Sequence, residues 1–234
     1  MKYLQKFLFS FLVFLFLTFV SFLSADGYTY ANESSRNYQK GIDISHHQGD
    51  IQWSSIDTSL DFIICKATEG VSFVDPKFKH NWDSIECTKG CYHFFRPQYS
   101  GEKQAQLYLS NINLESGNIK PIIDVEMTNH WKNHKHRKKY VQNLKNMVNT
   151  IISKTGQVPI IYTNGNFWND YISKYYDYSH ILWIADYRKR DNPNVPIDFN
   201  DWIIWQHSDK GKISGINGYV DLNYCKNIDT LLIK

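Results

Sequence analysis

The sequence predicts a single α/β barrel in which short buried strands alternate with helices along the chain. The 234 residues are 42% hydrophobic and 21% charged, a composition typical of a globular domain and unlike that of a disordered chain. Eight short runs rich in β-branched and aromatic residues recur between residues 41 and 223, and eight strands are enough to close a barrel. Helix-length stretches separate the early runs, and this alternation is typical of parallel barrels.

Residues 1–25 have the pattern of a secretory signal peptide. Lys2 and Lys6 precede an apolar run from Phe7 to Leu23, and two small residues follow it. A basic start, an apolar centre and small residues at the end are the features of a cleavable export signal. The run is slightly shorter than a membrane-spanning helix, which usually has about 20 residues. We therefore expect export, with the segment either cleaved or kept as a membrane anchor.

Residues 26–40 are polar and are expected to form a leader before a catalytic barrel at 41–234. The eight expected strands follow one another through that region. They are residues 41–45, 61–66, 90–95, 120–126, 158–162, 181–187, 202–206 and 219–223. Pro121 and Pro159 lie at the starts of two of these runs, a position that a strand tolerates.

Helices are predicted between the early strands and are expected to be scarce after Tyr162. Residues 103–113 and 138–154 carry apolar side chains at helical spacing. After Tyr162 the connections shorten and contain turn residues, as in Asn192-Pro-Asn194, which leaves little room for full helices. The barrel is therefore expected to lack helices on one side, and no second domain is indicated.

The cysteines leave the disulfide pairing open. They are Cys65, Cys87, Cys91 and Cys225. Export would permit disulfide bonds, but Cys65 and Cys91 lie in apolar strand-like runs, where buried free thiols are as common. The spacing contains no paired C-x-x-C units, so no zinc site is predicted.

The charge of the chain argues against polyanionic partners for the molecule as a whole. Its 26 basic and 23 acidic residues give a formal net charge of +3, and part of this excess lies in the signal segment. A chain so close to neutral gives no reason to expect a nucleic acid or an anionic membrane as partner. Membrane association is expected only if the N-terminal segment stays uncleaved, and a monomer is expected.

Acidic residues at the ends of predicted strands form the most informative local pattern. In the run Ile122-Ile-Asp-Val-Glu126 the two acids are two positions apart, so both project from the same face of a strand. Crowded carboxylates push their pKa values apart, which leaves one protonated beside an ionised partner. Asp43 and Asp221 lie at the ends of other strands, and such ends converge at the mouth of a barrel. These acids favour hydrolysis of a glycosidic bond.

Aromatic residues accompany these acids in the same strand-like runs. They are Tyr92, Tyr162, Trp183, Tyr187 and Trp205. Sugars expose apolar C–H faces, so a cleft lined by aromatic rings with a few polar anchors suits a saccharide. Gln206 adds an amide that can form hydrogen bonds with an acetamido group.

Histidines offer a competing interpretation as a metal site. The candidates are Asp43 with His46 and His47, and a cluster of His130, His134 and His136. Such a set would suit a metal-dependent polysaccharide deacetylase. The cluster, however, lies in the basic stretch Lys132 to Lys139, whose cations would repel a metal ion. We therefore expect neither a metal site nor a cofactor, and interpret the stretch as a solvated surface that can attract an anionic polymer such as a cell-wall glycan.

Eight short motifs follow one another between residues 41 and 223. They are Gly41-Ile-Asp-Ile-Ser-His-His-Gln-Gly49, Ile64-Cys-Lys-Ala-Thr-Glu-Gly70, Gly90-Cys-Tyr-His-Phe94, Pro121-Ile-Ile-Asp-Val-Glu126, Ile161-Tyr-Thr163, Leu182-Trp-Ile-Ala185, Trp205-Gln206 and Gly218-Tyr-Val-Asp-Leu-Asn223. In this order and spacing the chain resembles the glycoside hydrolase family 25 muramidases, the Chalaropsis-type lysozymes. The resemblance implies a modified TIM-like barrel of eight strands and about five helices.

The resemblance also implies an activity and roles for individual residues. The expected reaction is hydrolysis of the β-1,4 bond between N-acetylmuramic acid and N-acetylglucosamine in peptidoglycan. Glu126 would be the general acid, with Asp124 as a partner that orients the substrate or stabilises positive charge, and Asp43 and Asp221 match further acidic positions of the cleft. The positions expected to line the groove are Lys66, Glu69, Tyr92, Tyr162, Asp186, Tyr187, Trp205 and Gln206.

Three functions therefore compete. A secreted lysozyme acting at the cell envelope is the leading hypothesis, and a metal-dependent polysaccharide deacetylase or hydrolase is the second. A non-catalytic glycan-binding module is the third, and it has no physical need for the paired acids Asp124 and Glu126. The resemblance leaves open whether the second step uses a carboxylate nucleophile, an activated water or the acetamido group of the substrate.

Overall fold

The structure is a computed structural model that describes residues 37–177, 180–188 and 190–234. The predicted signal segment and nearly all of the polar leader lie outside these ranges. Tyr38–Lys234 forms one compact unit. None of its described helices combines the length and the apolar character that crossing a bilayer requires.

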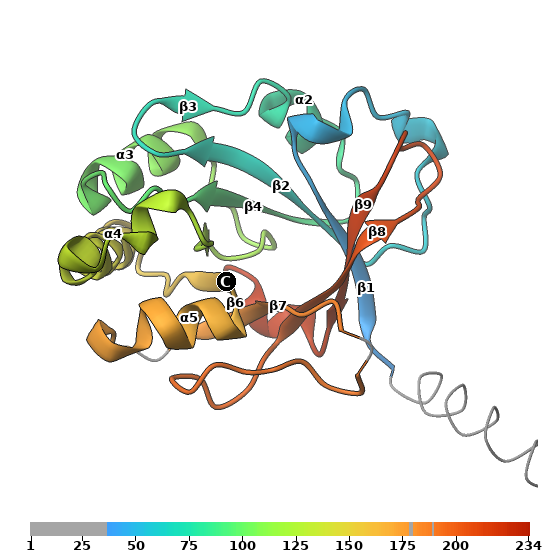
Figure 1. Cartoon of the computed structure of the whole chain (residues 1–234). Coiled ribbons are helices and arrows are strands. Elements are labelled where there is room, and N and C mark those ends of the chain that lie inside the picture. Colours follow the sequence, from blue (N-terminus) through green and yellow to red (C-terminus); the bar gives the residue numbers. More distant parts are fainter. Residues whose placement is uncertain (1–36, 178–179, 189) are drawn as a thin grey trace, which may run out of the picture. The chain divides into compact units, whose positions relative to one another are not determined.

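One sheet of nine strands curves until its first and last parts meet (Figure 1). The strand order is β1-β9-β8-β7-β6-β5-β4-β2-β3, and β1 also pairs with β2, which closes eight strands into the predicted barrel. The strands are β1 Gln39–Ile44, β2 Phe62–Glu69, β3 Phe73–Val74, β4 Thr88–Phe94, β5 Ile122–Asp124, β6 Ile160–Asn164, β7 Ile181–Ala185, β8 Ile204–Gly211 and β9 Val220–Cys225. Each of the eight expected strands is therefore confirmed.

Two features of the sheet depart from the expected parallel pattern. β9 runs antiparallel to both of its neighbours, β1 and β8. The connection between β8 and β9 is too short for the crossover that a parallel neighbour needs, so the chain turns back as a hairpin. In addition, β3 pairs antiparallel with β2 outside the closed barrel. A strand of two residues leaves no periodic signal in a sequence.

Four α-helices lie within the described ranges, close to the five or so expected. They are α2 Phe78–Ser84, α3 Gly101–Asn111, α4 Arg137–Thr155 and α5 Gly165–Tyr171. The predictions for α3 and α4 are confirmed within two residues, and the second half of the barrel has one short helix, α5. In α3, a Cβ at Gly101 would lie 1.8 Å from the backbone oxygen of Asn143 in α4, so only glycine permits this close helix packing.

The apolar core has two layers, because alternate residues of a strand face opposite sides of the sheet. The outer layer fills the space between the strands and the helices, and the inner layer fills the barrel. Along several strands an apolar inner residue is followed two positions later by a polar one. Such pairs are Ile64 and Lys66, Ile122 and Asp124, Ile160 and Tyr162, and Ile204 and Gln206. The barrel interior thus changes from apolar to polar toward one end, the mouth.

All four cysteines are free thiols in the structure. Cys65 and Cys91 are neighbours on the parallel strands β2 and β4, and both are buried in the outer layer. Burial raises the pKa of the Cys91 thiol to about 12, so this group stays protonated. The cysteines are therefore small apolar side chains of the core.

Candidate active site

The four predicted acids meet at the mouth of the barrel. The register between β1 and β9 places Asp43 directly opposite Asp221. Asp124 ends β5, and Glu126 follows two positions later. The charge of Glu126 helps to raise the pKa of Asp43, and the charge of Asp221 helps to raise that of Glu126. The acids therefore lie within one electrostatic field, although they come from three strands.

Asp43 is held by two amide side chains. Its Oδ2 accepts a hydrogen bond from Nε2 of Gln206 at 2.8 Å and another from Nδ2 of Asn223 at 2.7 Å. Burial raises the pKa of Asp43 to about 6, although the hydrogen bonds from both amides oppose this rise. The carboxyl group is therefore largely ionised at pH 7 and fixed in place.

Each of these amides is oriented at its other end. Oε1 of Gln206 accepts hydrogen bonds from the hydroxyl groups of Tyr162, at 2.7 Å, and of Tyr187. Oδ1 of Asn223 accepts a hydrogen bond from Nε1 of Trp183 at 2.8 Å. Because the amide oxygens are occupied by donors, the amide nitrogens must face Asp43. This network presents Asp43 with donors alone.

Asp221 supplies a proton to the same pair. Burial and then the charge of Asp43 raise the pKa of Asp221 to about 8. A hydrogen bond with Asp221 lowers the pKa of Asp43, so the proton lies on Asp221 and is donated to Asp43. This half of the mouth thus holds one negative charge and one proton at neutral pH.

The second pair, Asp124 and Glu126, also retains a proton. Asp124 is only 5% exposed, and burial, followed by repulsion from Glu126, holds its pKa well above its usual range. Burial likewise raises the pKa of Glu126, while a hydrogen bond from Asp124 lowers it. Across the described ranges, Oδ1 of Asp124 is left without a hydrogen-bond partner. An unpaired buried oxygen is costly unless a ligand satisfies it.

Cations form one wall of the mouth. Nζ of Lys66 contacts Oε2 of Glu69 at 2.5 Å, and Arg96 donates to the other oxygen of Glu69, from Nε at 2.8 Å. Lys66 is buried, and its positive charge lowers the pKa values of Asp124 and Glu126 against the effect of burial. This ion-pair group therefore limits how basic the second pair becomes. The sequence analysis did not single out Arg96.

Among the expected groove residues, Tyr92, Tyr162, Tyr187 and Gln206 are brought to the acids. Desolvation, followed by the charge of Asp124, raises the pKa of the hydroxyl of the half-buried Tyr92, which therefore stays a neutral donor. Asp124 pairs in register with Tyr162 across β5 and β6. These side chains line the mouth on the side of the barrel interior.

The structure does not bring Asp186 and Trp205 into this cluster. Asp186 accepts hydrogen bonds from Arg188, with Nε at 2.7 Å and Nη2 at 2.6 Å, and thereby holds the loop after β7. Trp205 packs in the outer layer, where its Nε1 donates to the backbone oxygen of Asp186 at 2.8 Å. Each lies one position away from an inner residue, Tyr187 or Gln206, and therefore on the opposite face of the sheet.

Asn223 is a second site residue, besides Arg96, that was not predicted from the sequence. It is almost fully buried and lies two positions after Asp221, so both share the inner face of β9. The spacing of two residues from Asp221 could have predicted that Asn223 lies in the site. An amide, however, does not by itself indicate acid–base chemistry as a carboxyl group does.

The histidines do not form a metal site with the acids. Throughout the ranges described above, no group of three or more His, Cys, Asp or Glu side chains is arranged to hold a metal ion. His130, His134 and His136 are exposed on two short 3₁₀ turns, Asn129–Lys132 and His134–His136. His46 instead contacts the buried Asp75, with 2.6 Å between Nδ1 and Oδ2.

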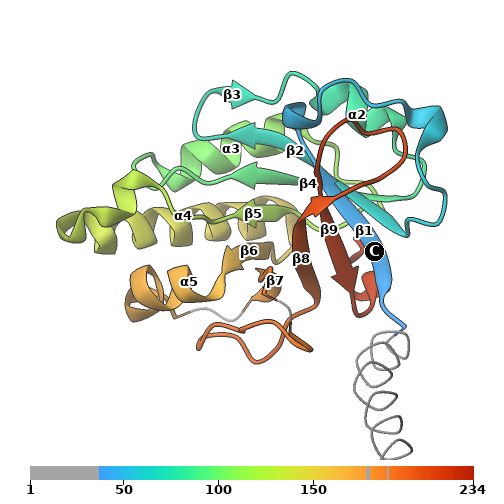
Figure 2. The same cartoon turned by 45° about the vertical axis from the view of Figure 1, so that its right-hand side comes forward.

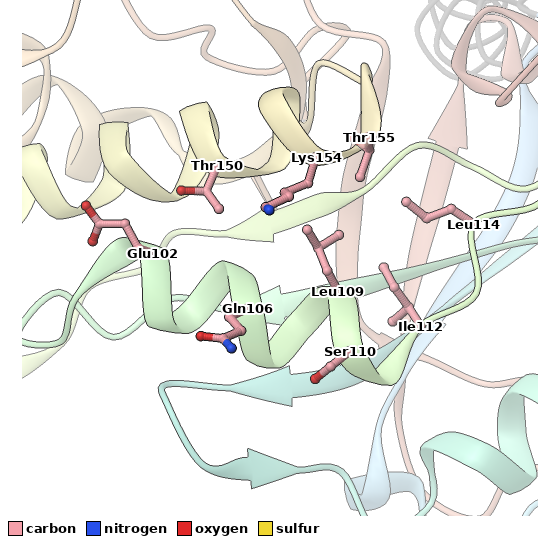
Figure 3. A pocket seen from close by; sticks show the side chains of 9 residues that line it. All are labelled: Glu102, Gln106, Leu109, Ser110, Ile112, Leu114, Thr150, Lys154 and Thr155. Carbon is pink, nitrogen blue, oxygen red and sulfur yellow. The ribbon is translucent and has the colours of Figure 1, made fainter.

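A separate surface pocket of about 670 Å³ lies between α3 and α4 (Figure 3). It is lined by Glu102, Gln106, Leu109, Ser110, Ile112, Leu114, Thr150, Lys154 and Thr155. It contains none of the predicted site residues. The pocket is therefore separate from the acids of the mouth.

Comparisons with known proteins agree with this geometry. The model of glycosyl hydrolases family 25 matches residues 42–216. The uncharacterized protein YegX of Escherichia coli K12 is 35% identical over 192 residues, which cover 78% of this chain and 68% of YegX. Lysozyme M1 of Streptomyces globisporus is 28% identical over 208 residues, 79% of this chain and 66% of that lysozyme.

Solved structures show the same fold. The bacterial lysozyme of Streptomyces coelicolor matches with a TM-score of 0.73 and 28% identity, over 82% of this chain and 94% of that one. A family 25 glycosyl hydrolase of Bacillus anthracis matches with a TM-score of 0.71 and 29% identity, over 80% and 88%. With its barrel, its ordered motifs and its paired acids, the chain belongs to glycosyl hydrolase family 25.

Proposed function

We propose that this chain is a lysozyme that hydrolyses the β-1,4 bond between N-acetylmuramic acid and N-acetylglucosamine in peptidoglycan. The observation that carries the proposal is the pair Asp124 and Glu126, which retains a proton at the barrel mouth beside a second pair, Asp43 and Asp221. Glycosidic cleavage needs a proton for the leaving oxygen and negative charge near the sugar. The two pairs supply both.

Glu126 is the general acid in this proposal. It is half-buried, whereas Asp124 is buried, so Glu126 is the acid that an incoming glycosidic oxygen can reach. Burial raises its pKa, which favours the protonated form that a general acid needs. The hydrogen bond from Asp124 places the proton of the pair on Asp124, from which it can pass to Glu126 and on to the leaving oxygen.

Asp124 acts as the partner of Glu126 on the sugar side. Its unpaired Oδ1 can accept a hydrogen bond from the substrate, which would orient the sugar, or can stabilise positive charge as the bond breaks. Asp43, ionised and held by Gln206 and Asn223, adds negative charge across the mouth.

Exposed aromatic side chains on β3 and on the loops around the mouth support a saccharide as substrate. Tyr187 is 46% exposed and Tyr219 59% exposed, and Phe73 and Tyr99 are also exposed. Rings that stay open to solvent can stack against the C–H faces of sugars. We propose that these rings bind successive sugars of a glycan strand.

The proposed site of action is the cell wall outside the producing cell. The N-terminal pattern and the similarity to Lysozyme M1 support export. Peptidoglycan is the proposed partner, and the enzyme is proposed to act as a monomer without a metal or cofactor.

The test is product release from purified peptidoglycan by the full chain and by its Glu126→Gln variant, each with and without EDTA. Mass spectrometry is expected to find fragments with reducing-end muramic acid, unaffected by EDTA and missing with the variant. The matched control is Glu86→Gln, which alters an exposed acid just before the start of β4, at the end of that strand opposite the mouth. This variant should keep full activity. Acetate release that EDTA abolishes would instead establish a deacetylase. Wall binding without any product would establish a binding module.

A further inference from the structure

The proposed function does not use the most basic surface of the described chain. Between Glu126 and Asp170 the sequence contains no acidic residue, and its first part carries a dense group of cations. Four exposed lysines define what we call the basic surface: Lys132, Lys135, Lys138 and Lys139. Exposed histidines at positions 130, 134 and 136 lie between and beside them.

The lysines of the basic surface have no acidic partners among the described residues. Elsewhere lysines do pair, as Lys145 does with Asp177 and Lys226 does with Asp201. An unpaired group of like charges produces a local positive potential that attracts a polyanion.

Helix stability does not explain this arrangement. The first turn of α4 contains Arg137, Lys138 and Lys139 and no acid, and the preceding His136 side chain forms no capping hydrogen bond. Cations at a helix N-terminus are unfavourable, because that end already carries a partial positive charge. A local conflict of this kind is typical of a surface that is kept for binding.

The surface rests on a rigid base. The Trp131 side chain is fully buried and meets the rings of Tyr140 and Phe167 edge-on, with centroids 5.7 and 5.6 Å away. Nε of Arg137 donates to the backbone oxygen of Trp131 at 3.0 Å, and its guanidinium lies over the ring of Tyr171. Arg137 therefore faces inward and fixes the segment, which leaves the four lysines as the outward cations.

The surface borders the mouth of the barrel. The 3₁₀ turn Asn129–Lys132 begins three residues after Glu126. α4 runs back along the barrel, so its first turn lies at the end toward which β2 and β4 point (Figure 2). A polymer bound by these lysines would lie beside a glycan strand in the mouth.

We propose that the basic surface binds a phosphodiester-linked anionic polymer of the cell wall and thereby holds the enzyme on its substrate. Lysine offers a compact charge on a flexible stem and binds phosphate as a point charge, which suits a flexible chain of single charges. The planar guanidinium fork, which binds a carboxylate or a phosphate through two hydrogen bonds, is absent from this surface because Arg137 is turned inward. The inference goes beyond the hydrolytic activity and does not depend on it.

Binding to purified bacterial walls tests the proposal. Two preparations are compared: walls that retain their phosphodiester polymer, and the same walls after hydrofluoric acid has removed it. Three forms of the full chain are sedimented with them: the wild type, the variant with the four lysines of the basic surface replaced by Gln, and a control with Lys79, Lys103, Lys154 and Lys234 replaced by Gln. The control loses the same charge at exposed lysines elsewhere.

The wild type and the control are expected to bind intact walls at least about tenfold more tightly than stripped walls at 50 mM salt, and to lose most of this difference at 200 mM. The basic-surface variant should bind both preparations alike. Equal loss in the control, or equal binding of the wild type to both preparations, would overturn the proposal. Hydrolysis of soluble glycan fragments, measured in parallel, should be the same in all three forms. Because this activity is read separately, its absence would count against the proposed function and not against the binding surface.

Discussion

Two pairs of carboxyl groups face each other at the mouth of the barrel, and they differ in how completely their oxygens are satisfied. In the first pair, Asp43 accepts hydrogen bonds from two amides that are themselves oriented by Tyr162, Tyr187 and Trp183. In the second pair, Asp124 keeps one oxygen without a partner, as far as the described residues go. The same chemical group is therefore fixed on one side of the mouth and left ready for a ligand on the other.

The difference has a physical cause in the sheet. Asp43 lies on β1, next to β9 and, one strand further, β8, whose inner faces present Asn223 and Gln206. Asp124 lies between β4 and β6, whose inner faces present aromatic side chains, and its counter-charge comes from Lys66. Fixed amides stabilise the negative charge of the first pair, whereas no such amide holds the second pair among the described residues, so the second pair can change its charge during a reaction.

The largest effect is expected from Glu126→Gln, which keeps the shape of the second pair but removes its acid. We expect the hydrolysis rate to fall about 100- to 10,000-fold, measured as product release from peptidoglycan at pH 6. The corresponding change at an exposed acid, Glu86→Gln, should have no effect. Near-normal activity of the Glu126→Gln variant would show that the second pair does not supply the catalytic proton, and the proposed difference in role between the two pairs would be wrong.

A smaller effect is expected from Asn223→Leu, which removes one of the two amide donors to Asp43. Loss of a hydrogen bond to a charged group should lower kcat/KM about tenfold to a hundredfold. The pKa of Asp43, about 6 in the wild type, should rise, because a hydrogen bond that lowers it is lost. The acid limb of the pH–rate profile should therefore move to higher pH. A loss of rate with an unmoved limb would show that Asn223 has only a structural role.

Asp221→Asn should change stability in a pH-dependent way. In the folded chain Asp221 keeps its proton up to about pH 8, whereas in the unfolded chain an aspartate ionises near pH 3.9. Its contribution to stability is thus complete below about pH 4 and is lost as the pH rises toward 8. Asparagine cannot ionise, so the Tm of the variant relative to the wild type should increase between pH 5 and pH 8.5. A constant difference in Tm would mean that Asp221 is not protonated in the fold.

The smallest effect on catalysis is expected from Trp205→Phe, which alters a residue outside the mouth. The change removes the hydrogen bond to Asp186, and should cost about 1–2 kcal/mol of folding free energy. Thermal unfolding should show a Tm lower by roughly 2–8 °C, while kcat/KM stays within about twofold. A large increase in KM would instead place Trp205 in the groove.

The period of two in strands explains how much of this site the sequence could reveal. It predicted that Asp124 and Glu126 project from the same face of a strand; β5 ends at Asp124, yet the two carboxyl groups still form a hydrogen bond with each other. The same rule places Tyr187 and Gln206 on the inner face and their neighbours Asp186 and Trp205 on the opposite face. A sequence motif does not distinguish the two residues of each adjacent pair. A family motif identifies a short segment that lies near the site. The pleat of the sheet then decides which residues of that segment face the barrel mouth.

Other features lay beyond the reach of the sequence. The reversed direction of β9 depends on the length of one loop, and the two residues of β3 are too few to show a pattern. The proton on Asp221 depends on burial and on a neighbour that is distant in the sequence, Asp43. Such properties arise only when the barrel closes and the two strands pair.

The reversed strand also has a consequence for how the enzyme can diversify. Because β8 ends and β9 begins at the mouth, the hairpin between them, residues 212–219, does not cross back to the base of the barrel. It is joined to the loop after β1 by the amide of Gln48, which donates to the backbone oxygen of Tyr219 at 3.3 Å. Ile216 of the hairpin is buried in the outer layer of the core, whereas residues 217–219 are exposed. Residues can therefore be added to or exchanged in this exposed part of the hairpin without repacking the core. In this part of the rim, a change of sequence is expected to alter glycan binding more than it alters the stability of the fold.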